Sequence, residues 1–407
     1  MPFDVVVIGA GAAGLMTAIR AAERGRRVVL LEKGKKPGVK ILMSGGTRCN
    51  ITHDCDARGI VAAFGPNGKF LHTALAAFSP RDAVAFFEAE GVATKIEETG
   101  KIFPVSDRAV DVLDALLKRL HRSGATLSLQ EPVSSIEPEG DGFRIVTAKQ
   151  TIDVPKVVIA TGGLSFPGCG TTGDGYGFAK QFGHTITPTA PALVPLKLDV
   201  PWVKELMGVT LPKVTLTIAD GDKALSSRSG SMLFAHFGLT GPAPLDVSKA
   251  VSQHAEPRRL TLVVDFLPDV KEMAIDDFLR IETLANPKQL LANILSRKLT
   301  RRLVDQLLPL AGLSPTRTAA ALSKADRGKL VAAIKRLKVP LAGTLGYEKA
   351  EVTTGGVKLD EVDHRTMQSK LKPGLFLVGE VLDLDGWIGG YNFQSAWSTG
   401  WLAGGVV

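Results

Sequence analysis

The pattern of apolar and polar positions predicts a strand–helix–strand unit at the start of the chain. An apolar, β-branched run covers residues 5–8, and a second apolar run covers residues 28–31. The segment between them is rich in alanine and stops at Gly25, which is typical of a helix and its end. Short apolar runs of this length predict buried strands. The beginning of the chain therefore indicates an α/β fold.

Helices and strands continue to alternate up to about residue 160. A proline directly after Ser79 predicts a helix that runs to Glu90 and stops at Gly91. Residues 94–105 are expected to form a short hairpin that turns at Thr99-Gly100. The other predicted elements are an amphipathic helix capped by Ser106-Asp107 and ended by Gly124, a strand over 126–129, a hairpin through 140–142, and a buried strand over 157–160.

The pattern changes near residue 188, where prolines at 188, 191, 195 and 201 mark a boundary. Alternating runs over 193–198, 214–218, 231–234 and 260–264 then predict strands. Residues 265 to about 341 have a helical pattern that is broken at Pro287, Pro309 and Pro315. The predicted parts are a first domain of 1–190 plus 346–407, a β-rich insert of 191–264 plus about 341–345, and a helical basic subdomain of 265–340.

Composition limits the class of protein. The chain has 407 residues, of which 45% are hydrophobic and 22% are charged, as in ordinary globular proteins. No apolar stretch reaches the ~18 residues of a membrane helix, and the first residues lead straight into a strand rather than a leader sequence. Cys49, Cys55 and Cys169 are odd in number and lack metal-ligand spacing. We expect a cytoplasmic protein without a metal site or a membrane partner.

The net charge of +8 is concentrated in the helical subdomain. A basic surface of this kind indicates either a nucleic-acid contact or a solvated helix face. The stretch from 297 to 338 contains no Phe, Tyr or Trp to stack on bases, so both interpretations stay open. Its basic residues are Arg297, Lys298, Arg301, Arg302, Lys324, Arg327, Lys329, Lys335, Arg336 and Lys338.

The first chemical motif is Gly9-x-Gly11-x-x-Gly14, which directly follows the first strand. The first glycine permits the tight turn, the second lets the backbone approach a pyrophosphate, and the third lets helix and strand pack closely. Glu32, at the end of the second strand, is placed to accept hydrogen bonds from ribose hydroxyls. This context indicates a dinucleotide site rather than an ordinary βαβ unit with a glycine-rich turn.

A second GxGxxG, over 168–173, does not predict another nucleotide site. No strand leads into it, because Pro167 intervenes, and Asp174 is instead expected to cap a helix over 175–182. One dinucleotide is therefore predicted, without a separate nicotinamide domain. The strand over 157–160 ends in Thr161-Gly162-Gly163, where the chain is expected to pass close to the nucleotide, and the backbone of Val133 is expected to meet adenine.

Two further segments are candidates for the flavin. The glycine- and lysine-rich stretch 34–54 reads as a loop over a cofactor, with Arg48 available to a phosphate or a flavin carbonyl, although a solvated basic loop would look similar. Near the end of the chain, a strand ends in Gly379-Glu380. Glu380 or Asp385 suits ribityl hydroxyls, and the backbone of 389–392 suits the flavin O2 edge, unless the glycines only form a turn.

Taken together, these motifs resemble the YhiN/BaiN-like, or aminoacetone-oxidase-like, family of FAD-dependent oxidoreductases. The resemblance implies a discontinuous two-dinucleotide-type FAD-binding Rossmann-like domain, an inserted β-barrel-like domain and a small helical domain. The chain departs from the family pattern at Thr47, where a glycine is usual, and at Cys169, which argues against a catalytic role for that thiol. The segments that carry the resemblance are 9–14 with 32–33, 44–50, 161–167 with 172–176, 236–242, 353–357 and 379–394.

The resemblance extends the predicted cofactor site beyond the residues that the motifs alone single out. The predicted FAD-binding residues are Gly9, Gly11, Ala12, Ala13, Gly14, Glu32, Lys33, Gly46, Arg48, Cys49, Asn50, Val133, Thr161, Gly162, Gly163, Asp174, Gly379, Glu380, Asp385, Gly389, Gly390, Tyr391 and Asn392.

Three functions follow as expectations. The main hypothesis is flavin hydride reduction of an activated C=C bond, in a ribosomal RNA uridine or in a conjugated enone, with NADH or NADPH as an external reductant. The alternatives are an oxidase of small amines such as aminoacetone that produces hydrogen peroxide, and an FAD-containing RNA-binding protein that contacts ribosomal RNA through the basic subdomain. The catalytic residue is not predicted, since Cys49, His184, His236 and Tyr391 are only candidates by residue type.

Overall fold

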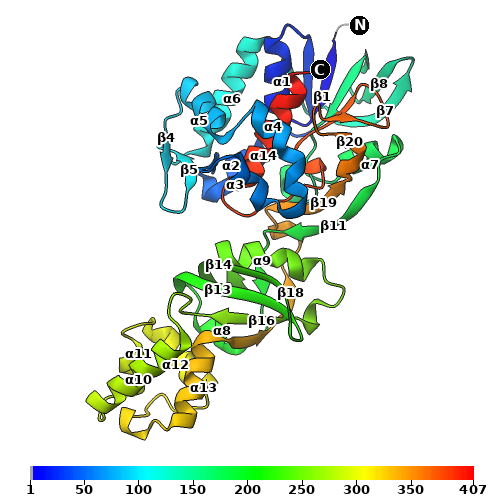
Figure 1. Cartoon of the computed structure of the whole chain (residues 1–407). Coiled ribbons are helices and arrows are strands. Elements are labelled where there is room, and N and C mark those ends of the chain that lie inside the picture. Colours follow the sequence, from blue (N-terminus) through cyan, green and yellow to red (C-terminus); the bar gives the residue numbers. More distant parts are fainter. Residues whose placement is uncertain (1–2) are drawn as a thin grey trace. The chain divides into compact units, whose positions relative to one another are not determined.

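The computed structural model describes residues 3–407, which form two compact units. Unit 1 contains the described residues up to Pro191 together with Ala350–Val407, and unit 2 contains Ala192–Lys349. Each unit has its own hydrophobic core. The first unit is therefore built from two distant stretches of the chain, between which the second unit is inserted (Figure 1).

The core of unit 1 is a seven-stranded sheet in the order β20-β21-β22-β10-β1-β2-β6. Strand β1 pairs in parallel with β2 and β10, in a register that places Val6 opposite both Val29 and Val157. All four residues of β1 are buried, which explains the continuous apolar run. The strands are β1 Val5–Ile8, β2 Val28–Glu32, β6 Thr126–Leu129, β10 Lys156–Ile159, β20 Val362–Asp363, β21 Gln368–Ser369 and β22 Leu375–Leu377.

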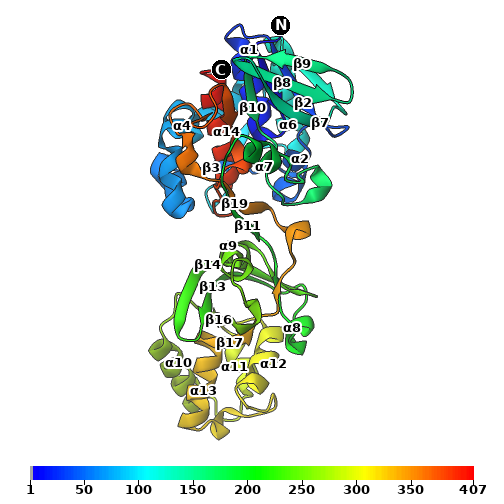
Figure 2. The ribbon, with the colours of Figure 1, turned by 90° about the vertical axis from the view of Figure 1, so that its right-hand side faces the viewer.

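Three smaller sheets complete the strands of unit 1. Figure 2 shows strands β8 and β9 beside β10, and the buried Phe143 and Ile145 of β8 join the same core as Val157. The smaller sheets are β3 Thr52–His53 with β5 Lys101–Pro104 and β4 Thr94–Ile96; β7 Val133–Glu139 with β8 Gly142–Thr147 and β9 Thr151–Val154; and β11 Ile186–Ala192 with β19 Val352–Val357.

The helices of unit 1 surround this sheet, and α1 packs along α14. The predicted start of α5 is confirmed, because Ser79 and Asp82 form a reciprocal capping box around Pro80. The helices are α1 Ala12–Glu23, α2 Val39–Thr47, α3 Ala57–Ala63, α4 His72–Ala77, α5 Pro80–Ala89, α6 Ala109–Ser123, α7 Asp174–Gln181 and α14 Tyr391–Gly404.

Two local predictions are wrong. Helix α6 is not capped by Ser106-Asp107; its N-cap is Arg108, and Asp107 has a left-handed φ of 54°. The stretch after Lys33 is not simply a long loop, because Val39–Thr47 is helical apart from a break at Ser44–Gly46. Tertiary packing explains the second difference, since Ile41 is buried in the core of unit 1 and compensates for the weak helix propensity of the glycines.

Unit 2 contains a seven-stranded sheet in the order β17-β16-β13-β14-β15-β12-β18. Its long central hairpin pairs β13 with β14, and α9 packs against both strands. The strands are β12 Leu196–Lys197, β13 Thr210–Asp220, β14 Lys223–Ala235, β15 Gly238–Thr240, β16 Thr261–Asp265, β17 Leu337–Pro340 and β18 Gly343–Thr344. The helices are α8 Pro201–Glu205, α9 Pro242–Ser252, α10 Glu272–Ala285, α11 Leu291–Leu295, α12 Arg301–Leu310 and α13 Lys324–Lys335.

The helices of unit 2 share one hydrophobic core with its sheet. Leu279 of α10, Leu307 of α12 and Ile334 of α13 are buried in the same cluster as Leu262 of β16. The predicted break at Pro309 is confirmed to within one residue, because α12 ends at Leu310 and this proline lies in its last turn. Within residues 3–407, none of the helices combines the length and apolar character that crossing a bilayer requires.

Candidate functional site

The turn between β1 and α1 can be built only with glycine. Gly9 has a φ of 103°, and a Cβ there would lie 2.6 Å from the carbonyl oxygen of Ala160. A Cβ on Gly14 would lie 1.9 Å from the carbonyl oxygen of Gly9. Helix α1 therefore begins directly at the carboxyl end of β1 and in contact with the end of β10.

The amino end of α1 is open where an anion would bind. A Cβ on Gly11 would meet no heavy atom within 4 Å, and among the described residues no side chain caps this helix end. The first-turn N–H groups and the helix dipole favour negative charge at such a position. The backbone at this turn therefore fits the pyrophosphate of a dinucleotide.

Glu32 is held in place beside this turn. Its Oε2 accepts a hydrogen bond from the Ala10 N–H at 3.0 Å, and its Oε1 accepts one from the Gly34 N–H at 2.7 Å. A carboxylate has about four acceptor positions, so two remain for ribose hydroxyls. The acid predicted from the sequence thus lies at the carboxyl end of β2, oriented by backbone groups on both of its sides.

Lys33 connects the end of β2 to the glycine-rich segment 168–173. Its Nζ donates to Thr172 Oγ1 and forms an ion pair with Asp174 at 2.5 Å. Asp174 is the first residue of α7, whose N-cap is Gly173, so the prediction that Asp174 caps this helix is wrong. Lys33 and Asp174 are therefore paired with each other in the structure, and direct contact of either side chain with FAD stays a prediction.

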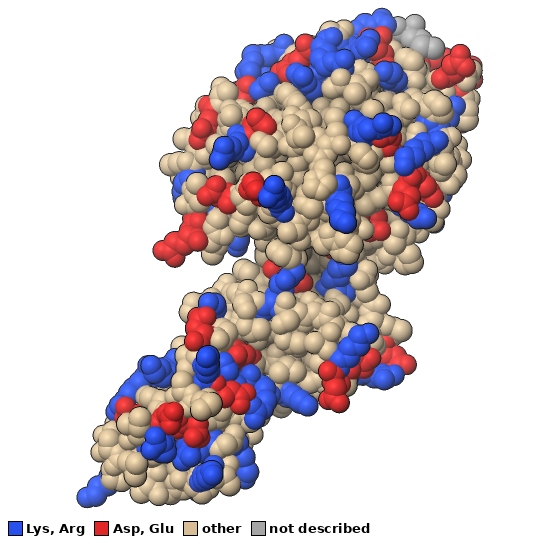
Figure 3. Space-filling view, in the orientation of Figure 1, with Lys and Arg blue, Asp and Glu red and all other residues tan. Residues whose placement is uncertain are grey.

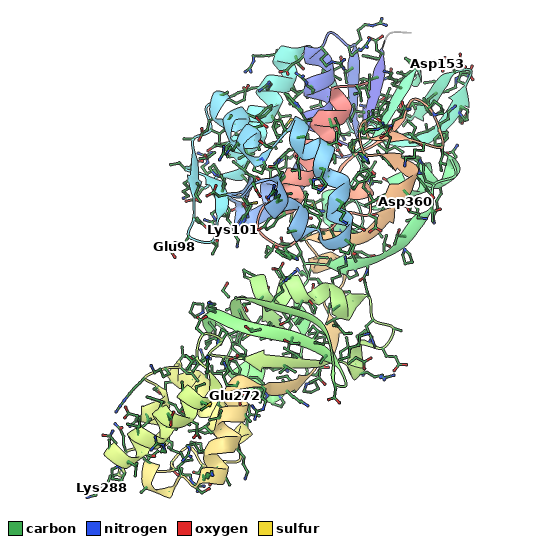
Figure 4. The ribbon with its side chains drawn as sticks, viewed as in Figure 1. Glu98, Lys101, Asp153, Glu272, Lys288 and Asp360 are labelled. Atoms are coloured by element: carbon green, nitrogen blue, oxygen red, sulfur yellow. The ribbon has the colours of Figure 1, made fainter. Side chains whose placement is uncertain are left out.

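The segment 44–50 packs against the hairpin of β4 and β5. Arg48 pairs with Glu97 at 2.7 Å and with Asp107 at 3.4 Å, and its guanidinium lies 3.9 Å from the centre of the Phe103 ring. Arg48 thus has two carboxylate partners, and its predicted contact with a phosphate or a flavin carbonyl stays a prediction. Figure 4 labels Glu98 and Lys101 at the end of the same hairpin, where Glu98 points outward.

Cys49 and Asn50 are buried at the centre of unit 1. Burial raises the pKa of the Cys49 thiol to about 12, despite its hydrogen bond with Ser44. This thiol is therefore neutral at physiological pH, which makes it a poor proton donor. The Asn50 side chain, in the orientation that satisfies its amide, accepts from the Gly390 N–H at 3.0 Å and donates to the Thr52 carbonyl.

Glu380 belongs to a polar network that joins four segments distant in sequence. Its Oε2 forms an ion pair with Lys40 of α2 at 2.6 Å. Its Oε1 accepts from Ser165 Oγ at 2.7 Å and from the Thr353 N–H at 2.8 Å. Lys40 also donates to Ser165 Oγ at 2.7 Å. Glu380 therefore orders the backbone of this region, in addition to any contact with a ribityl chain.

The start of α14 is equally constrained. The Gly390 N–H is bonded to Asn50, and its predicted contact with the flavin O2 edge stays a prediction. His53 Nδ1 lies 2.9 Å from the Gly389 carbonyl, and its ring stacks on Tyr391 with centroids 4.5 Å apart. The Asn392 side chain bonds both backbone groups of Gly386, so its role is to shape this loop rather than to offer a free amide.

The segment after β10 shows why the remaining glycines are needed. A Cβ on Gly163 would lie 2.5 Å from Thr353 Oγ1, and Gly162 has a φ of 74°. Across residues 3–407, nothing donates to or accepts from the buried Oγ1 of Thr161. A Cβ on Gly379 would lie 2.8 Å from the Cβ of Ala13, so the end of β22 comes close to α1. Val133 begins β7 and pairs with Thr147 of β8. Thr161, Gly162 and Gly163 thus lie beside the α1 turn, as the motif order indicates.

Sequence reasoning missed several polar residues of this region. Lys40, Ser165 and Thr353 join the Glu380 network, and His53 joins the start of α14. Their only signal in the sequence was their position inside glycine-rich segments, because each partner lies far away along the chain.

The histidine candidates have other roles. His184 is buried, with Nε2 2.8 Å from Ser369 Oγ and Nδ1 3.2 Å from Glu361. It therefore ties β21 to the end of α7 and is a structural residue. His236 is exposed in unit 2. Within the described residues, no group of three or more His, Cys, Asp and Glu side chains is arranged to hold a metal ion.

The burial of His184 predicts a pH dependence of stability. Burial lowers the pKa of His184 below its ordinary value of 6.5, and this outweighs the opposing effect of Glu361. Below about pH 6.5 the unfolded chain therefore binds a proton that the native state binds poorly, and the unfolding free energy falls. Urea unfolding of wild type and His184→Gln at pH 8 and pH 5.5 measures this. We expect a smaller decrease for the variant, and an equal decrease would contradict the assignment.

The basic residues of unit 2 are largely paired within the unit. The stretch 297–338 contains only two acids, Asp305 and Asp326, and most of the acidic partners of its basic residues lie earlier in unit 2, over 265–282. Figure 3 shows Asp and Glu interspersed among the Lys and Arg of this part. The pairs are Arg297–Glu282, Arg301–Asp305, Arg327–Asp276, Lys335–Asp265 and Arg336–Glu272. Lys298, Lys324 and Lys338 are exposed.

Comparisons with known proteins agree over the full length of the chain. A family model described as HI0933-like protein Rossmann domain matches residues 3–406. The chain is 39% identical over 402 residues to a ribosomal RNA dihydrouridine synthase of Escherichia coli, covering 98% of this chain and 96% of that protein. It is 32% identical over 402 residues to a 3-dehydro-bile acid delta(4,6)-reductase of Clostridium scindens, covering 98% and 97%.

One solved structure extends this comparison. A 3-ketosteroid-delta4-(5alpha)-dehydrogenase from Rhodococcus jostii RHA1 aligns with a TM-score of 0.56 at 14% identity, covering 99% of this chain and 96% of that chain. At this identity the likeness concerns the fold alone. The Rossmann-like architecture of unit 1 thus agrees with the family description, and the fold is that of a flavoprotein.

Proposed function

This chain belongs to the HI0933-like family and is an FAD-dependent oxidoreductase, and we propose that it reduces the C=C bond of a uridine in ribosomal RNA. The observation that carries the proposal is the 39% identity, over 98% of the chain, to a protein named for dihydrouridine synthesis in ribosomal RNA. The intact glycine turn and the fixed Glu32 support retention of the cofactor.

The residues of the chain have distinct tasks in this reaction. FAD, when bound and reduced, supplies a hydride to one carbon of the double bond, and a proton completes the other carbon. The amino end of α1 binds the pyrophosphate, and Glu32 binds a ribose. The Lys40–Glu380 network holds the segments after β10 and β22 in one arrangement. NADH or NADPH from solution would reduce the oxidised flavin again.

RNA contact is proposed for the exposed lysines of unit 2. Lys298, Lys324 and Lys338 are exposed, and Lys288, labelled in Figure 4, lies at the outer edge of the helical part. Lys298 Nζ lies 5.6 Å from the centre of the Phe278 ring, which leaves its ammonium exposed. An exposed lysine can neutralise a phosphate, and each such contact contributes about one to the salt dependence of binding. The paired Arg301, Arg336 and Lys335 are poorer candidates, because their charges are already balanced.

Charge reversal tests this contact. We expect Lys298→Glu, Lys324→Glu and Lys338→Glu together to lower affinity for ribosomal RNA fragments by about 10- to 1,000-fold at low salt and to reduce the salt slope by about three. Filter binding at several salt concentrations measures both quantities. The matched control reverses Arg58, Arg81 and Lys118, three exposed cations of unit 1. Equal losses in the two triple variants would contradict a specific role for unit 2.

The substrate is tested in cells. Ribosomal RNA from cells with and without the gene is digested to nucleosides, and dihydrouridine is quantified by mass spectrometry. We expect one modified position to lose dihydrouridine without the gene and to regain it on complementation. Unchanged dihydrouridine would exclude the RNA proposal, and hydrogen peroxide release from aminoacetone would favour the oxidase alternative.

A conjugated enone is the second candidate substrate. The 32% identity over the full chain to a bile acid reductase favours it, because that protein is also named for reduction of a conjugated system. Anaerobic mixing of the reduced protein with a 3-oxo-Δ4,6 steroid acid tests this candidate. Rapid flavin reoxidation by the steroid, together with no response to RNA, would make the enone the preferred assignment.

A further inference from the structure

A buried carboxylate lies at the end of the β-sheet where the adenosine of FAD is expected. Glu131 follows β6 and is 1% exposed. Its Oε1 accepts from Thr147 Oγ1 at 2.8 Å and from Gln150 Nε2 at 3.0 Å, and its Oε2 is bonded to Ser128 Oγ. All these partners are neutral, and Lys149 is the nearest cation, with Nζ 4.0 Å from Oε2. Buried carboxylates without a close ion pair are uncommon and call for an explanation.

The backbone of Glu131 is joined to the dinucleotide motif. Its N–H donates to the Glu32 carbonyl at 2.9 Å, and the N–H of Gln130 donates to the Gly34 carbonyl at 3.0 Å. Gln130 has a left-handed φ of 52°, so the chain turns sharply here. Two residues further on, Val133 begins β7 opposite Thr147, one of the donors to Glu131.

Glu131 therefore connects the two predicted contacts of the adenosine half. Through its backbone it fixes Glu32, whose side chain suits a ribose, and through its side chain it fixes the β7–β8 pair that contains Val133. Burial by itself would raise the pKa of Glu131, but the hydrogen bonds from Ser128, Gln150 and Thr147 and the charge of Lys149 lower it overall. The anion is thus held by a complete set of donors.

We propose that Glu131 is a positioning residue for the adenosine half of FAD, which holds Glu32 and Val133 at the spacing that the nucleotide requires. Glu131 does not itself contact the cofactor in this assignment. Leucine at 131 removes every acceptor, so that Ser128, Thr147 and Gln150 are no longer joined by one carboxylate. Glutamine at 131 keeps one oxygen toward Thr147 and Gln150, while Ser128 can accept from its amide, so most of the arrangement survives.

The test compares two flavins on the protein stripped of its cofactor. FAD contains the adenosine, whereas FMN lacks it and shares the flavin and one phosphate. We expect Glu131→Leu to lower FAD affinity by about tenfold or more, measured by fluorescence titration, because Ser128, Thr147 and Gln150 lose the carboxylate that joins them. FMN affinity is expected to stay within about twofold, and Glu131→Gln to recover most of the FAD affinity.

The matched control is Glu90→Gln. Glu90 is also a shielded carboxylate, with its side chain 5% exposed and paired with Arg119 and Arg122, but it ends α5, away from the nucleotide motif. We expect it to leave both flavin affinities unchanged. Equal losses of FAD and FMN affinity in Glu131→Leu, or no loss of either, would overturn the proposal. Should Glu131→Leu fail to fold, Thr147→Val takes its place, because it removes one donor to Glu131. A selective loss of FAD affinity in Thr147→Val supports the proposal, and unchanged FAD affinity overturns it.

Discussion

Gly14→Ala is expected to leave the protein without bound FAD. The added Cβ would lie 1.9 Å from the Gly9 carbonyl oxygen and 3.1 Å from the Gly9 carbonyl carbon. Both atoms belong to backbone that is itself fixed, because Gly9 N–H donates to the Leu31 carbonyl at 2.8 Å. Helix α1 must therefore move away from β1, and its amino end no longer meets the pyrophosphate. We expect FAD affinity to fall by at least about 100-fold and the unfolding free energy to fall by about 3 kcal/mol.

The ratio of flavin absorbance to protein absorbance after purification measures this loss. Gly177→Ala is the matched control, since a Cβ at this position in α7 would meet no heavy atom within 4 Å. Alanine there is expected to keep the full flavin content and to stabilise the protein by about 0.5–1 kcal/mol. A Gly14→Ala protein that purifies with normal flavin would show that α1 does not pack on β1 as described.

Lys40→Met is expected to have the second-largest effect. The side chains of Lys40 and Glu380 are 28% and 17% exposed, so this ion pair is partly shielded from water. Removing the ammonium leaves Glu380 Oε2 without its cation, while Oε1 still holds Ser165 and the Thr353 N–H. A partly shielded pair that loses one member costs about 1–3 kcal/mol, less than a fully buried one. We expect a 10- to 100-fold lower FAD affinity, because 1.4 kcal/mol is about tenfold.

A double-mutant cycle separates the ion pair from general damage. Lys40→Met, Glu380→Gln and the double variant are titrated with FAD, and the two single effects are expected not to add. Lys213→Met in unit 2 is the control, because Lys213 and Asp269 form a pair whose side chains are 53% and 69% exposed. Its removal is expected to change neither FAD affinity nor stability measurably. Strictly additive effects of Lys40→Met and Glu380→Gln would contradict a functional coupling between these residues.

The sequence predicted those features whose signals are local. The β1–α1–β2 unit, the β4–β5 hairpin and the α5 capping box each depend on residues close together in the chain. Each of these features is indicated by residues within about ten positions of one another: a glycine turn, a proline at the first helical position or an apolar run. The order of the strands in the sheet is a different matter, because it joins segments that are far apart in the chain, such as β1 and β10.

The features that sequence reasoning missed depend on distant partners. Lys40 meets Glu380 across 340 positions, and Arg48 meets Glu97 across 49 positions. A lysine or arginine inside a glycine-rich segment looks the same whether it faces a phosphate or a carboxylate. Helix α2 was predicted as a loop because its glycines disfavour helix, whereas the burial of Ile41 stabilises it.

Reduced FAD in this protein is expected to deliver its electrons to uridine. The most direct measurement reduces the bound flavin without oxygen, mixes it with a ribosomal RNA transcript that lacks dihydrouridine, and follows flavin absorbance and dihydrouridine together. The account predicts reoxidation by the transcript, with one dihydrouridine formed for each flavin oxidised. Flavin that stays reduced with RNA and is reoxidised only by oxygen or by a small enone would contradict it.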